Sequence, residues 1–124
     1  MIQITRINHV SLLVADTQRA LGFYHDTLGL AINTQRPELA FAGAWLDVGG
    51  NQQIHLLELA SDGGVPRAAA HGGRDRHLAM EVDSLEAVMH ALDEAGIDYT
   101  LSRSGRRALF CRDPDGNAVE LIEA

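Results

Sequence analysis

Apolar and polar residues follow one strand pattern, one helix pattern and three further strand patterns in the first half of this 124-residue chain. Residues 7–14 alternate with the period of two that is typical of a half-buried strand. Residues 17–28 carry apolar side chains at helical spacing, with Asp16 as the expected N-cap and Gly29 as the expected end. Three more strands are predicted over residues 30–34, 39–48 and 52–59.

The second half repeats the same order of elements. A strand is predicted over residues 76–82, and a helix follows as far as Ala95, with Asp83 and Glu86 forming a capping-box-like start. Gly96 closes that helix. Three strands are then expected over residues 97–101, 108–112 and 118–123. Each half is therefore a strand, a helix and three strands, which indicates an internal duplication.

The length indicates one domain over residues 1–124, built from one module over 1–60 and a second over 76–124. Residues 61–75 join the modules and are rich in glycine and alanine. That composition is typical of a connector, and we interpret it as one that can also act as a flap.

Charge and cysteine content narrow the classes of function. The net charge of −7 and the pI near 5.2 argue against a general binder of nucleic acid or anionic membranes. Cys111 is the only cysteine, so no intrachain disulfide can form and a reducing compartment is permitted. The first residues lack a signal-peptide pattern, and no apolar run approaches membrane-spanning length. We therefore expect a soluble cytoplasmic protein with no nucleic-acid or membrane partner.

The end of the chain carries the clearest turn signal. Residues 113–116 read Asp-Pro-Asp-Gly, in which aspartate caps the turn, proline presets φ and glycine relieves the last position. Glu120 follows in a strand whose two faces are both mostly apolar, so its side chain is expected to be enclosed. Because a buried carboxylate is costly unless it is paired or binds a metal, Glu120 is predicted to have a cationic partner.

Three histidines and this glutamate occupy equivalent positions in the two halves. His9 and His77 lie in the opening strands, whereas His55 and Glu120 lie in the last strands. Imidazole and carboxylate together suit Zn, Ni, Co, Mn or Fe(II). Ligands on strands favour a preorganised site that keeps positions for water and substrate, which is a catalytic rather than a structural arrangement. The pattern therefore predicts one divalent metal site.

A single histidine in a strand is more often a hydrogen-bonded core or edge residue than a ligand, so the equivalent placement of all four carries the metal hypothesis. Glu58 is adjacent to His55 and points to the opposite face, where we expect it to be exposed. Three histidines have no counterpart in the other half and are interpreted as surface or loop residues: His25, His71 and His90.

Two other features have simple interpretations. Cys111 is expected to be a small buried residue, because no histidine is placed to activate its thiol. Three arginines lie between the predicted strands 97–101 and 108–112, where they can attract an acidic substrate or, more simply, form a solvated hairpin rim: Arg103, Arg106 and Arg107.

Several motifs together identify a family. They are Ile-Asn-His-Val at 7–10, Phe-Tyr at 23–24 with Leu-Gly-Leu at 28–30, Asp-Arg-His-Leu-Ala at 75–79, and Asp-Pro-Asp-Gly-Asn at 113–117 leading to Glu-Leu at 120–121. With them the sequence resembles the vicinal oxygen chelate superfamily of glyoxalase I, fosfomycin- and bleomycin-resistance proteins, methylmalonyl-CoA epimerase and extradiol dioxygenases. The resemblance implies an α+β fold of two βαβββ modules that form curled mixed sheets around a divalent metal. It also implies a homodimer, often with modules of two chains enclosing each site.

By this resemblance the four residues fall on the metal-ligand positions: His9, His55, His77 and Glu120. Four residues near them are expected to line the substrate pocket: Ser11, Phe41, Trp45 and Leu57. Glyoxalase I typically carries glutamate at the position of His55. Three neutral histidines and one carboxylate leave a divalent site with a net positive charge, which strengthens the metal as a Lewis acid.

The leading hypothesis is a metal-dependent lyase or isomerase of the glyoxalase I type. It acts on a small substrate that chelates the metal through adjacent oxygens and passes through an enediolate, with Glu120 as the catalytic base. One alternative is an extradiol-type Fe(II) dioxygenase using His9, His77 and Glu120, although His55 would then occupy a position that the substrate or dioxygen needs. Further alternatives are a fosfomycin-type thiol transferase and a drug-binding protein of the bleomycin-resistance type.

Overall fold

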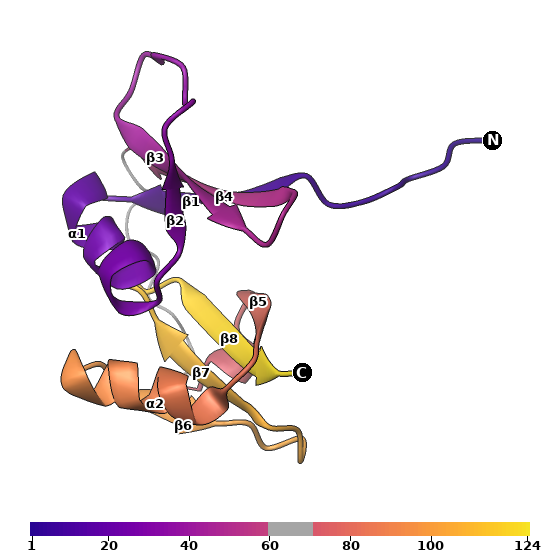
Figure 1. Ribbon diagram of the computed structural model, residues 1–124, viewed down its shortest axis with the longest axis vertical. Helices are drawn as coiled ribbons and strands as arrows, with labels where there is room; N and C mark the ends of the chain where they lie inside the picture. Colours follow the sequence, from indigo (N-terminus) through magenta and orange to yellow (C-terminus); the bar gives the residue numbers. More distant parts are fainter. Residues whose placement is uncertain (60–70) are drawn as a thin grey trace. The chain divides into compact units, whose positions relative to one another are not determined.

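The computed structural model describes residues 1–59 and 71–124 of the chain. It divides into two compact units, Met1–Ser61 and Asp62–Ala124, and each contains one four-stranded mixed sheet with a helix beside it (Figure 1). The fold is α+β, as the duplicated pattern and the resemblance predicted. The elements in chain order are β1 (His9–Val14), α1 (Thr17–Leu21), η1 (Gly22–Thr27), β2 (Ala31–Asn33), β3 (Gly43–Val48), β4 (Gln52–Glu58), η2 (Gly72–Arg74), β5 (His77–Val82), α2 (Leu85–Glu94), β6 (Tyr99–Leu101), β7 (Ala108–Arg112) and β8 (Ala118–Glu123).

The first unit has the strand order β1-β4-β3-β2, with β1 parallel to β4 and the other neighbours antiparallel. Alternation along the strands sends one set of side chains into the core of the unit. That core contains Val14, Leu46, Ile54 and Leu56, each at most 2% exposed, together with Tyr24 from η1. The opposite face of the sheet carries His9 and Ser11 of β1 and His55 of β4.

The helical stretch predicted over residues 17–28 changes its geometry halfway. It begins as α1, where the Asp16 carboxylate accepts from the Arg19 amide at 3.0 Å, as expected for an N-cap. It continues as the π-helix η1 over Gly22–Thr27, within which the Thr27 hydroxyl donates to the Gly22 carbonyl at 3.1 Å. The Leu28 amide donates to the Phe23 carbonyl at 3.0 Å, and this five-residue backbone spacing is that of a π turn. Gly29 follows with φ of +79° and ends the helix, as predicted.

The second unit repeats this topology, with the strand order β5-β8-β7-β6 and β5 parallel to β8. Its core side of the sheet includes Leu109, Val119 and Leu121, and α2 contributes Leu85 and Leu92 to the buried residues. The two units thus build the same sheet from different sequences, because both preserve the same alternation of apolar positions.

The start of α2 corrects one prediction. The N-cap is Ser84, not Asp83, and the Ser84 hydroxyl accepts from the Ala87 amide at 3.2 Å. The capping box with Glu86 was therefore wrong by one position. A carboxylate still binds the N-terminus of this helix, because Glu123 at the end of β8 accepts a hydrogen bond from the Leu85 amide at 2.9 Å.

The equivalent position in the first unit corrects a second prediction. Glu58 at the end of β4 is half-buried rather than exposed, and its carboxylate accepts from the Thr17 amide at 2.8 Å. Each last strand therefore ends in a glutamate that binds the first turn of its own unit's helix. The carboxylate satisfies an amide that has no partner within the helix and complements the positive end of its dipole.

The predicted turn over residues 113–116 is present. The Gly116 amide donates to the Asp113 carbonyl at 3.0 Å, and Gly116 has φ of +84°. The buried Asp113 carboxylate accepts from the amides of Asp115 and Asn117, both at 2.9 Å. These bonds fix the point at which β8 begins, at Ala118, five residues after the aspartate that caps the turn.

Three predicted strands begin two or more residues later than expected. The strand predicted from residue 7 starts at His9, the one predicted from residue 39 starts at Gly43, and the one predicted from residue 97 starts at Tyr99. In the second case the preceding segment is held by Arg36, whose guanidinium donates to the Phe41 carbonyl at 2.8 Å. Phe41 was therefore wrongly placed in the strand. Gly43 can pair closely because an added Cβ there would lie 2.1 Å from the Leu56 carbonyl oxygen.

The predicted connector lies partly outside the described residues, which omit 60–70. Its last residues form η2 in the second unit, where Gly72 is buried against β7 and β8. An added Cβ on Gly72 would lie 3.1 Å from the Cβ of Ala118 and 3.3 Å from the Phe110 ring, so glycine allows this close approach. Over the described ranges 1–59 and 71–124, the helices are too short and too polar to cross a membrane.

Candidate metal site

Both units place two predicted ligands next to each other by the same register. His55 of β4 pairs with Ser11 of β1, two residues beyond His9. Glu120 of β8 pairs with Ala79 of β5, likewise two residues beyond His77. Residues two apart in a strand share a face, so each unit brings one pair of candidate ligands to equivalent places on its sheet.

The pair in the second unit lies within reach of a shared cation. His77 Nε2 is 3.3 Å from Glu120 Oε1, and Glu120 is only 2% exposed. His77 Nδ1 lies 2.8 Å from the Asp75 carbonyl oxygen, which can only accept, so Nδ1 carries a proton. In a neutral ring Nε2 then directs its lone pair at the carboxylate. A proton or a metal ion between the two groups relieves this repulsion, and the donor atoms suit a divalent cation.

Glu120 also has the cationic partner that the sequence predicted. Arg106 Nη2 lies 3.1 Å from Glu120 Oε2, so the two carboxylate oxygens face different partners. We did not identify Arg106 as that partner from the sequence, where a solvated rim was the simpler interpretation. A signal was available: Arg106 has the same strand parity as Phe110, which pairs directly with Glu120.

The pair in the first unit forms part of a stack of rings. The His9 and His55 ring centroids are 3.9 Å apart with an interplanar angle of 15°. Trp45, which pairs with His55 across β3 and β4, covers the other face of the His55 ring at 4.2 Å and 3°. His55 thus lies between an imidazole and an indole.

Hydrogen bonds orient both rings of this pair. His9 Nδ1 lies 2.8 Å from the Asn8 side-chain oxygen, and His55 Nε2 lies 2.8 Å from the Gln53 side-chain oxygen. These contacts leave His9 Nε2 and His55 Nδ1 as the nitrogens available to a metal. Burial, the neighbouring His9 and the Arg36 charge lower the pKa of His55 below its ordinary value, which favours the neutral ring that a metal requires.

The stacked arrangement is not itself a chelating one. Imidazole lone pairs lie in the ring plane, and two nearly parallel rings 3.9 Å apart cannot both direct a nitrogen at one ion. A side-chain rotation of one ring would be needed, and His9 is the less restrained of the two because rings cover both faces of His55. By donor type, three imidazoles and one carboxylate suit a divalent cation. Neither unit gathers three metal-binding side chains by itself within the described residues.

The predicted pocket residues lie in different settings. Ser11 and Trp45 flank His55 through the pairing of β1, β4 and β3. Leu57 lies two residues beyond His55 on β4, on the same face of the sheet. Phe41 precedes β3, and its ring lies 5.7 Å from the Arg36 guanidinium carbon.

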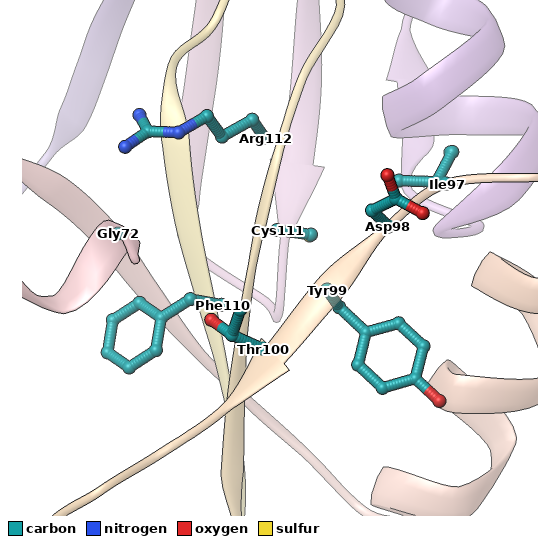
Figure 2. Close-up of a pocket in the computed structure, with 8 residues that line it drawn as sticks. All are labelled: Gly72, Ile97, Asp98, Tyr99, Thr100, Phe110, Cys111 and Arg112. Atoms are coloured by element: carbon teal, nitrogen blue, oxygen red, sulfur yellow. The ribbon is translucent and has the colours of Figure 1, made fainter. Parts of the chain in front are cut away.

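A separate cavity of about 250 Å³ lies in the second unit, and Figure 2 shows the side chains around it. It is lined by Gly72, the start of β6 and the end of β7, including Phe110, Cys111 and Arg112. None of the predicted ligands or pocket residues lines this cavity. Cys111 is 3% exposed, and burial together with Asp113 raises the pKa of its thiol to about 12. The prediction of a small buried residue is therefore confirmed, and the thiol is inert at neutral pH.

The three other histidines have local contacts. His25 Nδ1 lies 2.7 Å from the Leu30 carbonyl oxygen, and His90 lies 3.6 Å from Glu94 on the surface of α2. His71 differs from the predicted loop residue, because its Nδ1 lies 2.6 Å from the Thr100 hydroxyl and its ring meets Phe110 edge-on at 4.8 Å. It helps to hold η2 against the sheet of the second unit.

Comparison with known proteins identifies the family. Residues 6–121 match the sequence profile of the Glyoxalase/Bleomycin resistance protein/Dioxygenase superfamily. The chain is 36% identical over 126 residues to Glyoxylase I 4 of Arabidopsis thaliana, an alignment that covers 97% of this chain and 71% of that protein. It is 30% identical to a lactoylglutathione lyase of Haemophilus influenzae, over 95% of this chain and 92% of the other.

A solved structure agrees with this assignment at the level of the fold. TnmS3, an antibiotic binding protein from a Streptomyces species, is similar with a TM-score of 0.75 and 22% identity, and the similarity covers 99% of this chain and 98% of that one. The register that pairs Glu120 with Ala79, two residues beyond His77, therefore lies in a known fold. This chain belongs to the glyoxalase, bleomycin resistance protein and dioxygenase superfamily.

Proposed function

We propose that the protein is a divalent-metal-dependent lyase or isomerase of the glyoxalase I type, acting on a small substrate with two adjacent oxygens. The observation that carries the proposal is the close pair of His77 and Glu120, together with the equivalent pair of His9 and His55. The two pairs would complete one site, within a chain or across a homodimer. Relatives named glyoxylase I and lactoylglutathione lyase support the reaction class.

A bound Zn, Ni, Co, Mn or Fe(II) would supply Lewis acidity toward the substrate oxygens. The residues of the chain would supply the proton transfer. Glu120 would take a proton from one substrate carbon at a carboxylate oxygen and return it to the neighbouring carbon, so the reaction needs no external oxidant. Its 2% exposure excludes bulk water from that transfer. Trp45 would present an indole face beside His55 as one wall of the substrate pocket, next to Ser11 and Leu57.

The ring stack favours a second candidate. Because both faces of His55 are covered and Gln53 engages its Nε2, His55 is the most restrained of the four candidate ligands. A set limited to His9, His77 and Glu120 has the composition used by non-haem Fe(II) oxygenases. Oxygen uptake with a catechol after anaerobic loading with Fe(II) would favour this dioxygenase over the lyase.

The predicted cellular setting also belongs to this proposal. A single buried cysteine suits a reducing cytoplasm, and the superfamily resemblance suits a homodimer. Light scattering at micromolar protein concentration tests the dimer, and a monomer would count against it.

The decisive experiment assays the metal-stripped protein after loading with each cation in turn. The substrate is the hemithioacetal of methylglyoxal and glutathione, and the product thioester is followed by its ultraviolet absorbance. We expect activity only with metal, and a loss of about 100-fold or more in Glu120→Gln. His90→Gln is the matched control, because His90 contacts Glu94 on the surface of α2 and should leave the activity unchanged. Activity that survives chelation, or survives in Glu120→Gln, would contradict the proposal.

A further inference from the structure

An arginine reaches the candidate site from the hairpin between β6 and β7. Arg106 lies in this hairpin directly after Gly105, whose φ is +85°. Its Nε donates to the Ser104 hydroxyl at 3.3 Å, and its Nη2 donates to Glu120 at 3.1 Å. The Arg106 side chain is 59% exposed, whereas Glu120 is 2% exposed. The guanidinium therefore contacts the buried carboxylate while remaining accessible to solvent and to a ligand.

This contact sets the balance of charge at the site. Without a metal ion, the Arg106 charge neutralises the Glu120 carboxylate. A divalent cation beside one carboxylate and one guanidinium leaves a formal charge of about +2, because the histidines must be neutral to bind. An excess of positive charge beside this exposed guanidinium favours a negatively charged ligand.

The contact also predicts competition. A metal ion and Arg106 both seek the oxygens of Glu120, so cation binding weakens the ion pair that holds Arg106. The guanidinium then has donors to offer to another anion at the same place. Arginine suits this role because its planar fork matches a carboxylate or a phosphate.

We propose that Arg106 is the specificity-determining residue of this site and selects substrates with a negatively charged group, such as a carboxylate, at or beside the metal-binding oxygens. Arg106 is the counter-ion of Glu120 when no cation is bound and the counter-ion of the substrate when one is. The inference rests on the metal-dependent function proposed above and adds the class of substrate to it.

Its neighbours in the hairpin do not share this role. Arg107 contacts Glu123 and Glu86, on the side of the unit where α2 begins. Arg103 is exposed at the hairpin and provides a control of the same charge. Glutamine at position 103 removes one positive charge from the same loop without touching the Glu120 contact.

The test measures binding rather than turnover, by titration calorimetry on the zinc-loaded full chain. The two probes are lactate and acetoin, which share a hydroxyl beside an oxygen-bearing carbon but differ in charge. We expect Arg106→Gln to weaken lactate binding about tenfold and to change acetoin binding less than about twofold. Arg106→Lys should recover part of the lactate affinity, and Arg103→Gln should match the wild type for both probes.

Zinc titration of the metal-free variants comes first and separates the two proposals. Arg106→Gln should bind zinc about threefold or more tightly than the wild type, because a competitor for Glu120 is gone. If the wild type binds no zinc, the proposed function fails and this inference fails with it. If zinc binds but Arg106→Gln affects lactate and acetoin equally, or affects neither, only the role of Arg106 is overturned.

Discussion

Asp113 is the residue whose removal should most weaken the turn that leads into β8. Its carboxylate is 4% exposed and accepts from the Asp115 amide, the Asn117 amide and the Asn117 side-chain amide, each at 2.9 Å. Asp113→Ala removes all three acceptor contacts. Hydrogen bonds to a charged group contribute about 1.5–3 kcal/mol each, but Asp115 and Asn117 are half-buried and water can replace part of the loss. We therefore expect the free energy of unfolding to fall by about 3 kcal/mol.

Urea denaturation followed by far-ultraviolet circular dichroism measures this loss. Trp45 fluorescence is unsuitable as the only probe, because Trp45 lies in the first unit whereas Asp113 lies in the second. Asp113→Asn is the matched control, since it keeps one side-chain oxygen for the backbone amides and should lose only about 1 kcal/mol. A loss below about 1 kcal/mol for Asp113→Ala, or equal losses for both variants, would refute the view that this carboxylate holds the turn.

Three further predictions concern the turn and the ligands. Gly116→Val should lower the free energy of unfolding by about 1–3 kcal/mol in the same urea assay, because φ is +84° and a β-branched residue is strained there; a neutral result would contradict this. In metal-free protein, the depressed pKa of His55 means that its contribution to stability is present above pH 6.5 and is lost as the pH falls through the lower folded-state pKa. The fluorescence of Trp45, which stacks on this ring, should change in that acidic window, and a transition above pH 6.5 would be inconsistent with the lowered pKa. Glu120→Gln should weaken zinc binding more than His55→Gln in calorimetric titrations, because only the first change removes a negative charge; the reverse order would place His55 at the centre of the site.

The repeated order of strands and helices could be predicted from the sequence because alternation and helical spacing are local properties of the chain. The duplication placed His77 and Glu120 in the opening and last strands of the second half, and the family resemblance implied that these strands would belong to one module. The enclosure of Glu120 was also predictable, since apolar residues occupy both faces of its strand. These features depend on side-chain order alone, and the structure confirms them.

Other features depend on geometry that the sequence pattern does not contain. The ring stack of His9, His55 and Trp45 depends on the register of β1, β4 and β3. Of these, β1 and β4 are parallel and far apart in the sequence, so their register is not fixed by a turn between them. Strand parity places Arg106 on the face of Glu120, but its contact with Glu120 depends on the path of the hairpin around Gly105, which residue spacing alone does not give. In both cases a contact distant in sequence decides the chemistry.

Errors at the ends of elements have a common cause. Asp83 and Ser84 are both residue types that cap helices well, and which of them is the N-cap depends on where β5 ends and the helical backbone begins. Glu58 was expected to be exposed because it faces away from His55, but the helix that begins at Thr17 covers that face. Local rules identified the residue types that make these contacts but not the partners they meet.

The central claim is that three imidazoles and one carboxylate bind one divalent cation. X-ray absorption spectroscopy of the zinc-loaded protein tests it most directly, because imidazole rings scatter in a way that carboxylates do not. The account predicts one zinc per chain, three imidazole ligands at about 2.0–2.2 Å, and two imidazoles after His55→Gln. Retention of the wild-type spectrum in His77→Ala, or a site with no imidazole ligands at all, would contradict it.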